Sequence, residues 1–136
     1  MNKDKIIEIL NKVRVEELTA IMQYLQHHYL AKGINSQVVG ELFKSISLTE
    51  MKHAYMVAER ITALGGVPTT KIDKLKVPEK LEDMIRENYE TEKKAIVDFK
   101  AFIGEVSEDI TTRRMLEDIL VDEEGHLDVL GKLLEN

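Results

Sequence analysis

The stretch Glu50-Met51-Lys52-His53 places a carboxylate and an imidazole three residues apart, and Glu123-Glu124-Gly125-His126 repeats this spacing near the end of the chain. Residues three apart in a helix lie on the same face. In both stretches that face is otherwise apolar, so the ionisable side chains stand where core residues are expected. One Glu-x-x-His pair is common on a helix surface, whereas two pairs on inward faces indicate a shared polar site inside the protein.

Apolar residues recur at three-and-four spacing in four segments, which predicts four long amphipathic helices. Their expected ranges are residues 4–31, 36–64, 78–103 and 110–134. Gly33 and the pair Gly65-Gly66 are typical of helix ends, and Pro78 suits the first turn of the third helix. The chain is therefore expected to be all-α.

The segment from Val67 to Pro78 is a long connection for a small protein. A helix of about 28 residues is roughly 40 Å long, and an extended segment of about 12 to 14 residues crosses nearly that distance. The second and third helices are thus expected to run parallel, joined by a crossover, while the short connections imply antiparallel neighbours. The predicted fold is an all-α four-helix bundle, with antiparallel pairs and a long crossover between the second and third helices, that forms a single domain over residues 1–136.

Composition narrows the function classes. A length of 136 residues suits one core. The net charge of -6 argues against nucleic-acid binding, and the absence of cysteine excludes disulfides and thiolate metal sites. No apolar run is long enough to cross a membrane, and the first residues lead into an amphipathic helix rather than a signal peptide. A cytoplasmic location is expected.

Each predicted inward stripe is interrupted near its middle by ionisable side chains. These are Glu17, Glu50, His53, Glu92, Glu123 and His126. Four carboxylates buried together would repel one another, and each uncompensated buried charge costs several kcal/mol or so. Two divalent cations would neutralise them, because carboxylates bridge metals and imidazole suits iron, manganese or zinc. A closed structural zinc site would not need six ligands.

The ligand from the third helix has two candidates. Glu92 falls on the inward stripe and is followed three residues later by the small residue Ala95, whereas a gap-free count from Glu123 favours Glu90. Because a ligand must face the interior, Glu92 is predicted.

The sequence resembles bacterioferritins along nearly its whole length. The resemblance is carried by Leu10-Asn11-Lys12, Glu17-Leu18-Thr19-Ala20-Ile21, Gln23-Tyr24, Glu50-Met51-Lys52-His53-Ala54, Glu59-Arg60-Ile61 and Asp122-Glu123-Glu124-Gly125-His126. It implies a ferritin-like four-helix bundle and, within it, a di-iron centre of the ferritin-like kind. Glu17 and His53 would be terminal ligands of one iron, Glu92 and His126 of the other, and Glu50 and Glu123 would bridge the two.

The resemblance also implies a reaction, ferroxidase, in which dioxygen or hydrogen peroxide oxidises two ferrous ions. Tyr24 lies seven residues after Glu17 on the same stripe. It could hydrogen-bond a ligand carboxylate or donate an electron, or it could be a core tyrosine with a satisfied hydroxyl.

A second apolar stripe on the first helix lies away from the core and consists of Leu18, Met22, Leu25 and Tyr29. One helix with two apolar faces usually has two neighbours, which predicts a homodimer through this face. Met51 lies about 100° round the second helix from Glu50. In bacterioferritins the matching methionine ligates a haem shared across such a dimer, so Met51 is a candidate ligand of haem b. The alternative is a methionine packed in a dry interface.

The sequence departs from bacterioferritins in two respects, the missing fifth helix and the residues at positions 45 and 49. Their short fifth helix, which lines a pore of the cage, has no counterpart before the chain ends, and this puts a full cage in doubt. Ser45 and Thr49 stand where family members often carry His and Asp for iron on the inner cage surface. The pair His27-His28 is interpreted as surface or interface rather than as ligands.

Three functions follow from these patterns. The leading one is oxidation of Fe(II) for iron storage or detoxification. The first alternative is a rubrerythrin-like di-iron peroxidase or oxygen scavenger that stores no mineral. The second is a helical module whose site holds structural zinc or manganese without catalysis.

Overall fold

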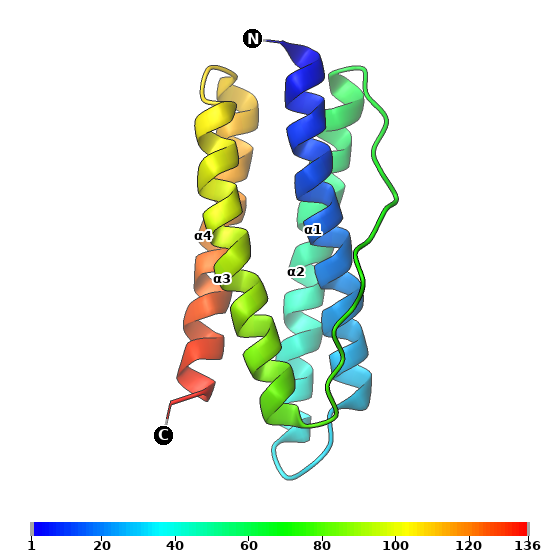
Figure 1. Ribbon diagram of the computed structural model, residues 1–136, viewed down its shortest axis with the longest axis vertical. Coiled ribbons are helices and arrows are strands. Elements are labelled where there is room, and N and C mark those ends of the chain that lie inside the picture. The colour runs from blue at the N-terminus through cyan, green and yellow to red at the C-terminus, as the bar shows by residue number, and fades with distance from the viewer. Residues whose placement is uncertain (1, 136) are drawn as a thin grey trace.

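A computed structural model describes residues 2–135 of the chain. Four helices form the predicted bundle (Figure 1): α1 (Lys3–Leu30), α2 (Ser36–Ala63), α3 (Leu81–Glu105) and α4 (Ile110–Leu133). Helices α1 and α2 pack closely as one antiparallel hairpin, and α3 and α4 form a second. The long connection between α2 and α3 runs beside α1 for most of the height of the bundle, so α2 and α3 point the same way, as the crossover prediction requires.

The helix ends follow the sequence closely except at α3. Gly65 has a φ of 89°, a left-handed conformation that glycine adopts without strain, and it ends α2 as predicted. Helix α3 begins at Leu81, not at Pro78. The crossover is still bound to the bundle at Lys76, as described below, so the chain needs the residues from 77 to 80 to turn into the helix.

The interior consists of two apolar clusters separated by a polar layer. The lower-numbered part of α1 and the end of α2 contribute to the first cluster, with Phe99 and Leu116 from the other hairpin. The second cluster includes Phe43 and Met84 and lies toward the opposite end of the bundle. Between them, every helix places one buried glutamate. The apolar clusters exclude water from this layer on both sides, which strengthens the electrostatic interactions within it.

The inward stripe of α4 does not continue to the end of the helix. Leu133 keeps the three-and-four spacing of that stripe but has a relative exposure of 42%. It lies in the final turn of the helix, one turn beyond Leu130, which is fully buried. Within residues 2–135, no helix is both long and apolar enough to cross a membrane.

A ring of four hydrogen bonds fixes the crossover to the bundle at Lys76. The backbone N–H of Lys76 donates to Gln23 Oε1 over 3.0 Å, and its carbonyl accepts from His27 Nε2 over 2.8 Å. Asn88 closes the ring, because its Oδ1 accepts from Gln23 over 3.1 Å and its Nδ2 donates to His27 Nδ1 over 2.9 Å. These partners select the neutral imidazole protonated on Nε2.

The ring corrects the interpretation of His27 as a surface residue. Its side chain is fully buried, and burial lowers its pKa from the ordinary value. His28, by contrast, is half-buried, and its Nδ1 lies 2.7 Å from the carbonyl oxygen of Gly40. Earlier along the crossover, Asn11, Arg14 and Thr19 of α1 bind its backbone. The crossover is therefore a fixed wall of the bundle.

Candidate metal centre

The polar layer brings together all six side chains that the sequence singles out. They form two overlapping groups in which the potential ligand atoms lie within 4.8 Å of one another: Glu17, Glu50, His53 and Glu123, and Glu50, Glu92, Glu123 and His126. The four glutamates and His53 are at most 3% exposed, and His126 is 14% exposed. Glu50 and Glu123 belong to both groups, so they occupy the position from which a carboxylate can bridge two metals.

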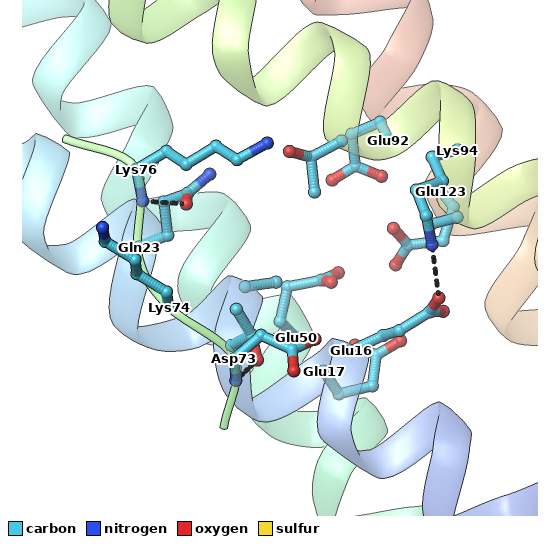
Figure 2. Close-up of a pocket in the computed structure, with 14 residues that line it drawn as sticks. Glu16, Glu17, Gln23, Glu50, Asp73, Lys74, Lys76, Glu92, Lys94 and Glu123 are labelled. Carbon is cyan, nitrogen blue, oxygen red and sulfur yellow. Dashed lines mark hydrogen bonds and ion pairs between the residues drawn. The ribbon is translucent and has the colours of Figure 1, made fainter. Parts of the chain in front are cut away.

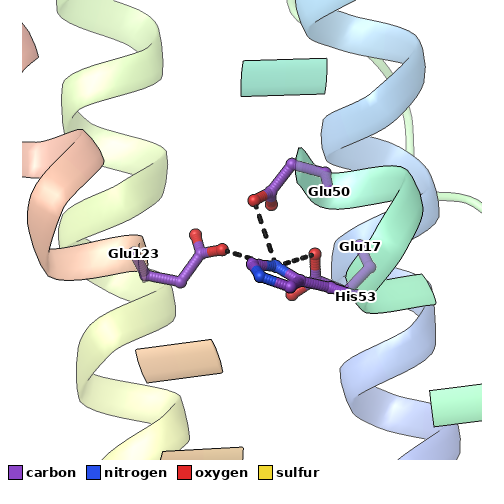
Figure 3. Close-up of side chains that lie close together, drawn as sticks. All are labelled: Glu17, Glu50, His53 and Glu123. Carbon is purple, nitrogen blue, oxygen red and sulfur yellow. Dashed lines mark ion pairs between the residues drawn. The ribbon is translucent and has the colours of Figure 1, made fainter. Parts of the chain in front are cut away.

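In the first group, three carboxylates surround one imidazole nitrogen (Figure 3). His53 Nδ1 lies 3.4 Å from Glu17 Oε2, 3.4 Å from Glu50 Oε1 and 3.3 Å from Glu123 Oε1. The carboxylates come from α1, α2 and α4, so the two hairpins meet at this point.

In the second group, His126 Nδ1 lies 3.6 Å from Glu50 Oε1 and 3.6 Å from Glu92 Oε1. Tyr24 donates its hydroxyl to Glu92 Oε1 over 2.8 Å, which is one of the roles considered for it from the sequence. Glu92 is buried, whereas Glu90 is exposed. The inward-stripe criterion therefore selected the glutamate of α3 that reaches the centre.

The donor atoms fit a pair of divalent cations. Each of the six residues has one buried side-chain atom with no hydrogen-bond partner within residues 2–135: Glu17 Oε2, Glu50 Oε1, His53 Nδ1, Glu92 Oε2, Glu123 Oε1 and His126 Nδ1. A buried polar atom without a partner costs about 1–3 kcal/mol. Six such atoms aimed at one layer are explained by ligation, and their carboxylate and imidazole chemistry suits iron, manganese or zinc.

The protonation of the metal-free site reflects this crowding. Burial, followed by repulsion from neighbouring carboxylates, raises the pKa of Glu17 and of Glu123 to about 7, and that of Glu50 well above its usual range. Burial and Glu123 raise the pKa of Glu92 to about 8. The carboxyl groups thus retain protons near neutral pH, and a bound metal must displace them.

The pKa of His53, the histidine of the first group, is set by its neighbouring carboxylates rather than by burial. Burial alone would lower the pKa of His53, but the attraction of the nearby Glu123, Glu17 and Glu50 carboxylates outweighs it and raises the pKa far above the ordinary value. Without metal, His53 is therefore an imidazolium that partly neutralises the three carboxylates.

Asp122 also contacts the centre, and the sequence interpretation did not predict this contact. Its Oδ2 lies 2.7 Å from His53 Nε2, the nitrogen that faces away from the carboxylates. Metal-binding histidines commonly donate their second nitrogen to a carboxylate, which fixes the ring and increases its basicity. Asp122 directly precedes Glu123 in the sequence, so the adjacent acidic residue was the available signal.

A cavity of about 220 Å³ leads to the polar layer from the side of the crossover (Figure 2). Glu17, Glu50, Glu92 and Glu123 line its buried part, while the exposed residues Asp73 and Lys74 of the crossover line its mouth. Glu16 also lines it, and burial followed by a hydrogen bond with Asp98 raises the pKa of Glu16 to about 9. The cavity provides a path for small molecules or ions to the cluster.

Met51 is separate from this centre. It lies on α2 next to Glu50 but is 38% exposed. Tyr55, one turn further along α2, and Met22 and Tyr29 of α1 are also exposed. Of the apolar stripe predicted on the first helix, Met22 and Tyr29 are exposed, whereas Leu18 and Leu25 are partly buried.

Comparisons with known proteins agree with the fold and the site. Residues 7–136 match the model of the ferritin-like domain family. A bacterioferritin from Desulfovibrio desulfuricans is 37% identical over 128 residues, which cover 92% of this chain and 72% of the relative. A bacterioferritin from Streptomyces coelicolor is 32% identical over 134 residues, covering 96% of this chain and 80% of that protein.

A solved structure gives a similar picture. The chain superposes with a TM-score of 0.93 on a protein from Bacillus anthracis strain Ames described as a ferritin-like, diiron-carboxylate protein. The two are 29% identical, and the match covers 99% of this chain and 100% of the other. The similarity thus includes all four helices and the crossover.

Proposed function

The chain belongs to the ferritin-like domain family, and from that premise we propose that it is a bacterioferritin-like di-iron protein that oxidises Fe(II). The observation that carries this proposal is the set of six buried donor atoms that have no hydrogen-bond partner within residues 2–135 and form two groups sharing Glu50 and Glu123. A site for one metal would not need both groups. Two acidic residues common to two adjacent positions suit a reaction in which two ions act together.

Each residue has a defined role in this proposal. Glu17 and His53 would hold one iron, Glu92 and His126 would hold the other, and Glu50 and Glu123 would serve both. Iron bound there would supply two electrons, one from each Fe(II), to reduce dioxygen to hydrogen peroxide or hydrogen peroxide to water. The Tyr24 hydroxyl holds Glu92 in place through its hydrogen bond, and the carboxyl groups release their protons as the ions enter.

The surroundings of the site support the same chemistry. The two apolar clusters keep bulk water from both sides of the layer, so the carboxylates act in a medium where they attract cations strongly. The cavity beside the crossover is the proposed entrance for Fe(II) and the oxidant, because its buried end is lined by four of the proposed ligands.

A matched pair of variants on α3 tests the proposal. We expect the wild-type protein to accelerate the aerobic oxidation of Fe(II) over buffer, and Glu92→Gln to lower this rate by about 100-fold, since losing a ligand should exceed the effect of losing a supporting residue. Glu90→Gln removes the same charge two residues away from an exposed position and should retain the wild-type rate. The measurement is the absorbance of Fe(III) after rapid mixing.

Two results would count against the proposal. A wild-type rate equal to that of buffer would refute ferroxidase activity and favour the module that holds structural metal. Equal rates in the two variants would remove Glu92 from the centre. Size-exclusion chromatography after iron loading separates storage from detoxification, because a species of dimer size is incompatible with a cage.

We also propose that the exposed apolar face of α1 and α2 forms a homodimer interface that includes Met51. Met22, Tyr29, Met51 and Tyr55 together provide apolar surface of the kind that protein partners cover. We further propose that this dimer binds haem b between the Met51 side chains of its two subunits. A cytoplasmic location stays a prediction.

Sedimentation equilibrium and visible absorption test the interface. We expect a dimer, and Met22→Lys, placed in the middle of the stripe, should shift it toward the monomer because a buried lysine would lack a partner. Protein expressed with ample haem should show a Soret band that Met51→Leu removes. A monomeric wild type would refute the interface, and a wild type without the band would refute haem binding.

A further inference from the structure

The two hairpins carry equivalent halves of the proposed centre. Helices α2 and α4 run in opposite directions, and each contributes Glu-x-x-His from its middle: Glu50 with His53, and Glu123 with His126. An approximate two-fold axis across the bundle therefore exchanges the two groups. The two groups also have the same composition, three carboxylates and one imidazole. Donor type and number alone predict two equal metal positions.

The residues that precede the two glutamates break this equivalence. Asp122 stands before Glu123 and reaches across to α2, where its Oδ2 lies 2.7 Å from His53 Nε2. The residue that stands before Glu50 is Thr49, whose hydroxyl is directed to its own helix, 3.4 Å from the carbonyl oxygen of Ser45. Within residues 2–135, Nε2 of His126 makes no hydrogen bond to a side chain or to the backbone. One histidine is thus held by a carboxylate and the other is not.

This difference has a direct consequence for ligation. A carboxylate on Nε2 keeps Nδ1 as the metal-binding nitrogen, fixes the ring and increases its basicity. His53 receives all three effects, whereas His126 has no such partner on Nε2 within residues 2–135 and is more exposed, at 14% against 3%. In addition, Tyr24 donates to Glu92 Oε1, which withdraws electron density from a donor of the second group only.

We propose that the two metal positions are unequal, and that Asp122 is the positioning residue that makes the position of Glu17 and His53 the tighter one. This inference rests on the proposed two-metal site and adds an order of filling to it. The ion beside His53 binds first, and the ion beside His126 binds second and leaves first. Thr49 is the reason that the second position lacks the same support.

Anaerobic titration with Co(II), monitored by calorimetry and by visible absorption, tests whether the two metal positions differ in affinity. It requires no catalytic turnover. The wild-type protein should bind two Co(II) ions in two resolved steps. Asp122→Asn should weaken the tighter step by about 10- to 100-fold, the usual effect of removing a supporting group. Glu124→Gln is the matched control, because it removes one negative charge two residues further along α4 from an exposed side chain, and it should leave both steps unchanged.

Thr49→Asp tests the same inference through an increase in metal affinity, which damage to the fold would not produce. It gives His126 the partner that His53 already has, so the weaker step should strengthen by about tenfold or more and approach the tighter one. An Asp122→Glu variant, which restores the carboxylate, should bind more tightly at the first step than Asp122→Asn.

The outcomes separate this inference from the proposed function. Two Co(II) ions bound with equal affinity by the wild type would overturn the inequality and leave the di-iron proposal standing. Fewer than two ions bound would overturn both. If Asp122→Asn behaves like Glu124→Gln, or if Thr49→Asp leaves the weaker step unchanged, the assignment to these two positions is wrong.

Discussion

Glu50→Ala should lower the rate of Fe(II) oxidation by at least about 100-fold, more than the 10- to 100-fold cost of losing a group that only supports a ligand. The reason is position rather than charge. Glu50 Oε1 lies 3.4 Å from His53 Nδ1 and 3.6 Å from His126 Nδ1, so it is one atom shared by both groups. Its removal should weaken both metal positions together, whereas Glu17→Ala should weaken one. Stopped-flow oxidation and Co(II) titration of the same preparations measure the two effects.

Glu41→Ala is the control for Glu50→Ala, since Glu41 lies on the same helix and is exposed. It should oxidise Fe(II) at the wild-type rate. Circular dichroism should show the same helix content in the wild type, Glu50→Ala and Glu41→Ala. A Glu50→Ala protein that binds two ions and oxidises Fe(II) normally would mean that the bridging position is wrongly assigned.

The metal-free protein should lose stability as the pH rises from about 7 to about 8.5, and divalent metal should abolish this loss. Burial raises the pKa of Glu92 to about 8 and that of Glu50 well above its usual range, whereas both groups in the unfolded chain titrate near the ordinary glutamate pKa of 4.5. Over this interval the folded state holds protons that the unfolded state has lost. A carboxyl group that keeps its proton across 1.5 pH units, as Glu50 does, makes folding less favourable by about 2 kcal/mol, and Glu92, which loses its proton near pH 8, contributes less.

The two buried histidines, His27 and His53, do not oppose this loss of stability between pH 7 and pH 8.5. The pKa of His27 is lowered, so its contribution is fully present above the unfolded value of 6.5 and is lost only at lower pH. The pKa of His53 is raised, so its stabilising contribution falls with rising pH, in the same direction as the glutamates. Urea unfolding with a chelator and with Zn(II) measures the effect. Stability that increases with pH in the metal-free protein would show that the carboxyl groups are already ionised.

The sequence predicted the four helices and the inward position of the six proposed ligands for one physical reason. Long amphipathic helices repeat every 3.6 residues, so the phase set by apolar residues such as Phe43 and Leu116 also determines where Glu50 and Glu123 point. The same phase separated Glu92 from Glu90 without any structural information. Six ionisable residues at matching depth on four helices could then be grouped, because each short connection fixes the direction of the next helix.

The features that the sequence did not yield depend on contacts between distant segments. His27 lies on the inward stripe, but its burial is tolerated only because Lys76 and Asn88 satisfy both ring nitrogens. Neither partner can be identified from periodicity. Asp122 has an exposed helix position by pattern, and its role follows from the approach of α4 to α2. The late start of α3 at Leu81 has the same origin, since the crossover is held at Lys76.

Crystals soaked anaerobically with Fe(II) and measured at the iron absorption edge test the central proposal most directly. The proposal predicts two anomalous peaks in the polar layer, one bounded by Glu17 and His53 and the other by Glu92 and His126, with Glu50 and Glu123 between them. At low iron the peak beside His53 should be the stronger one. A single peak bound by all the glutamates, or iron only outside the layer, would contradict the account.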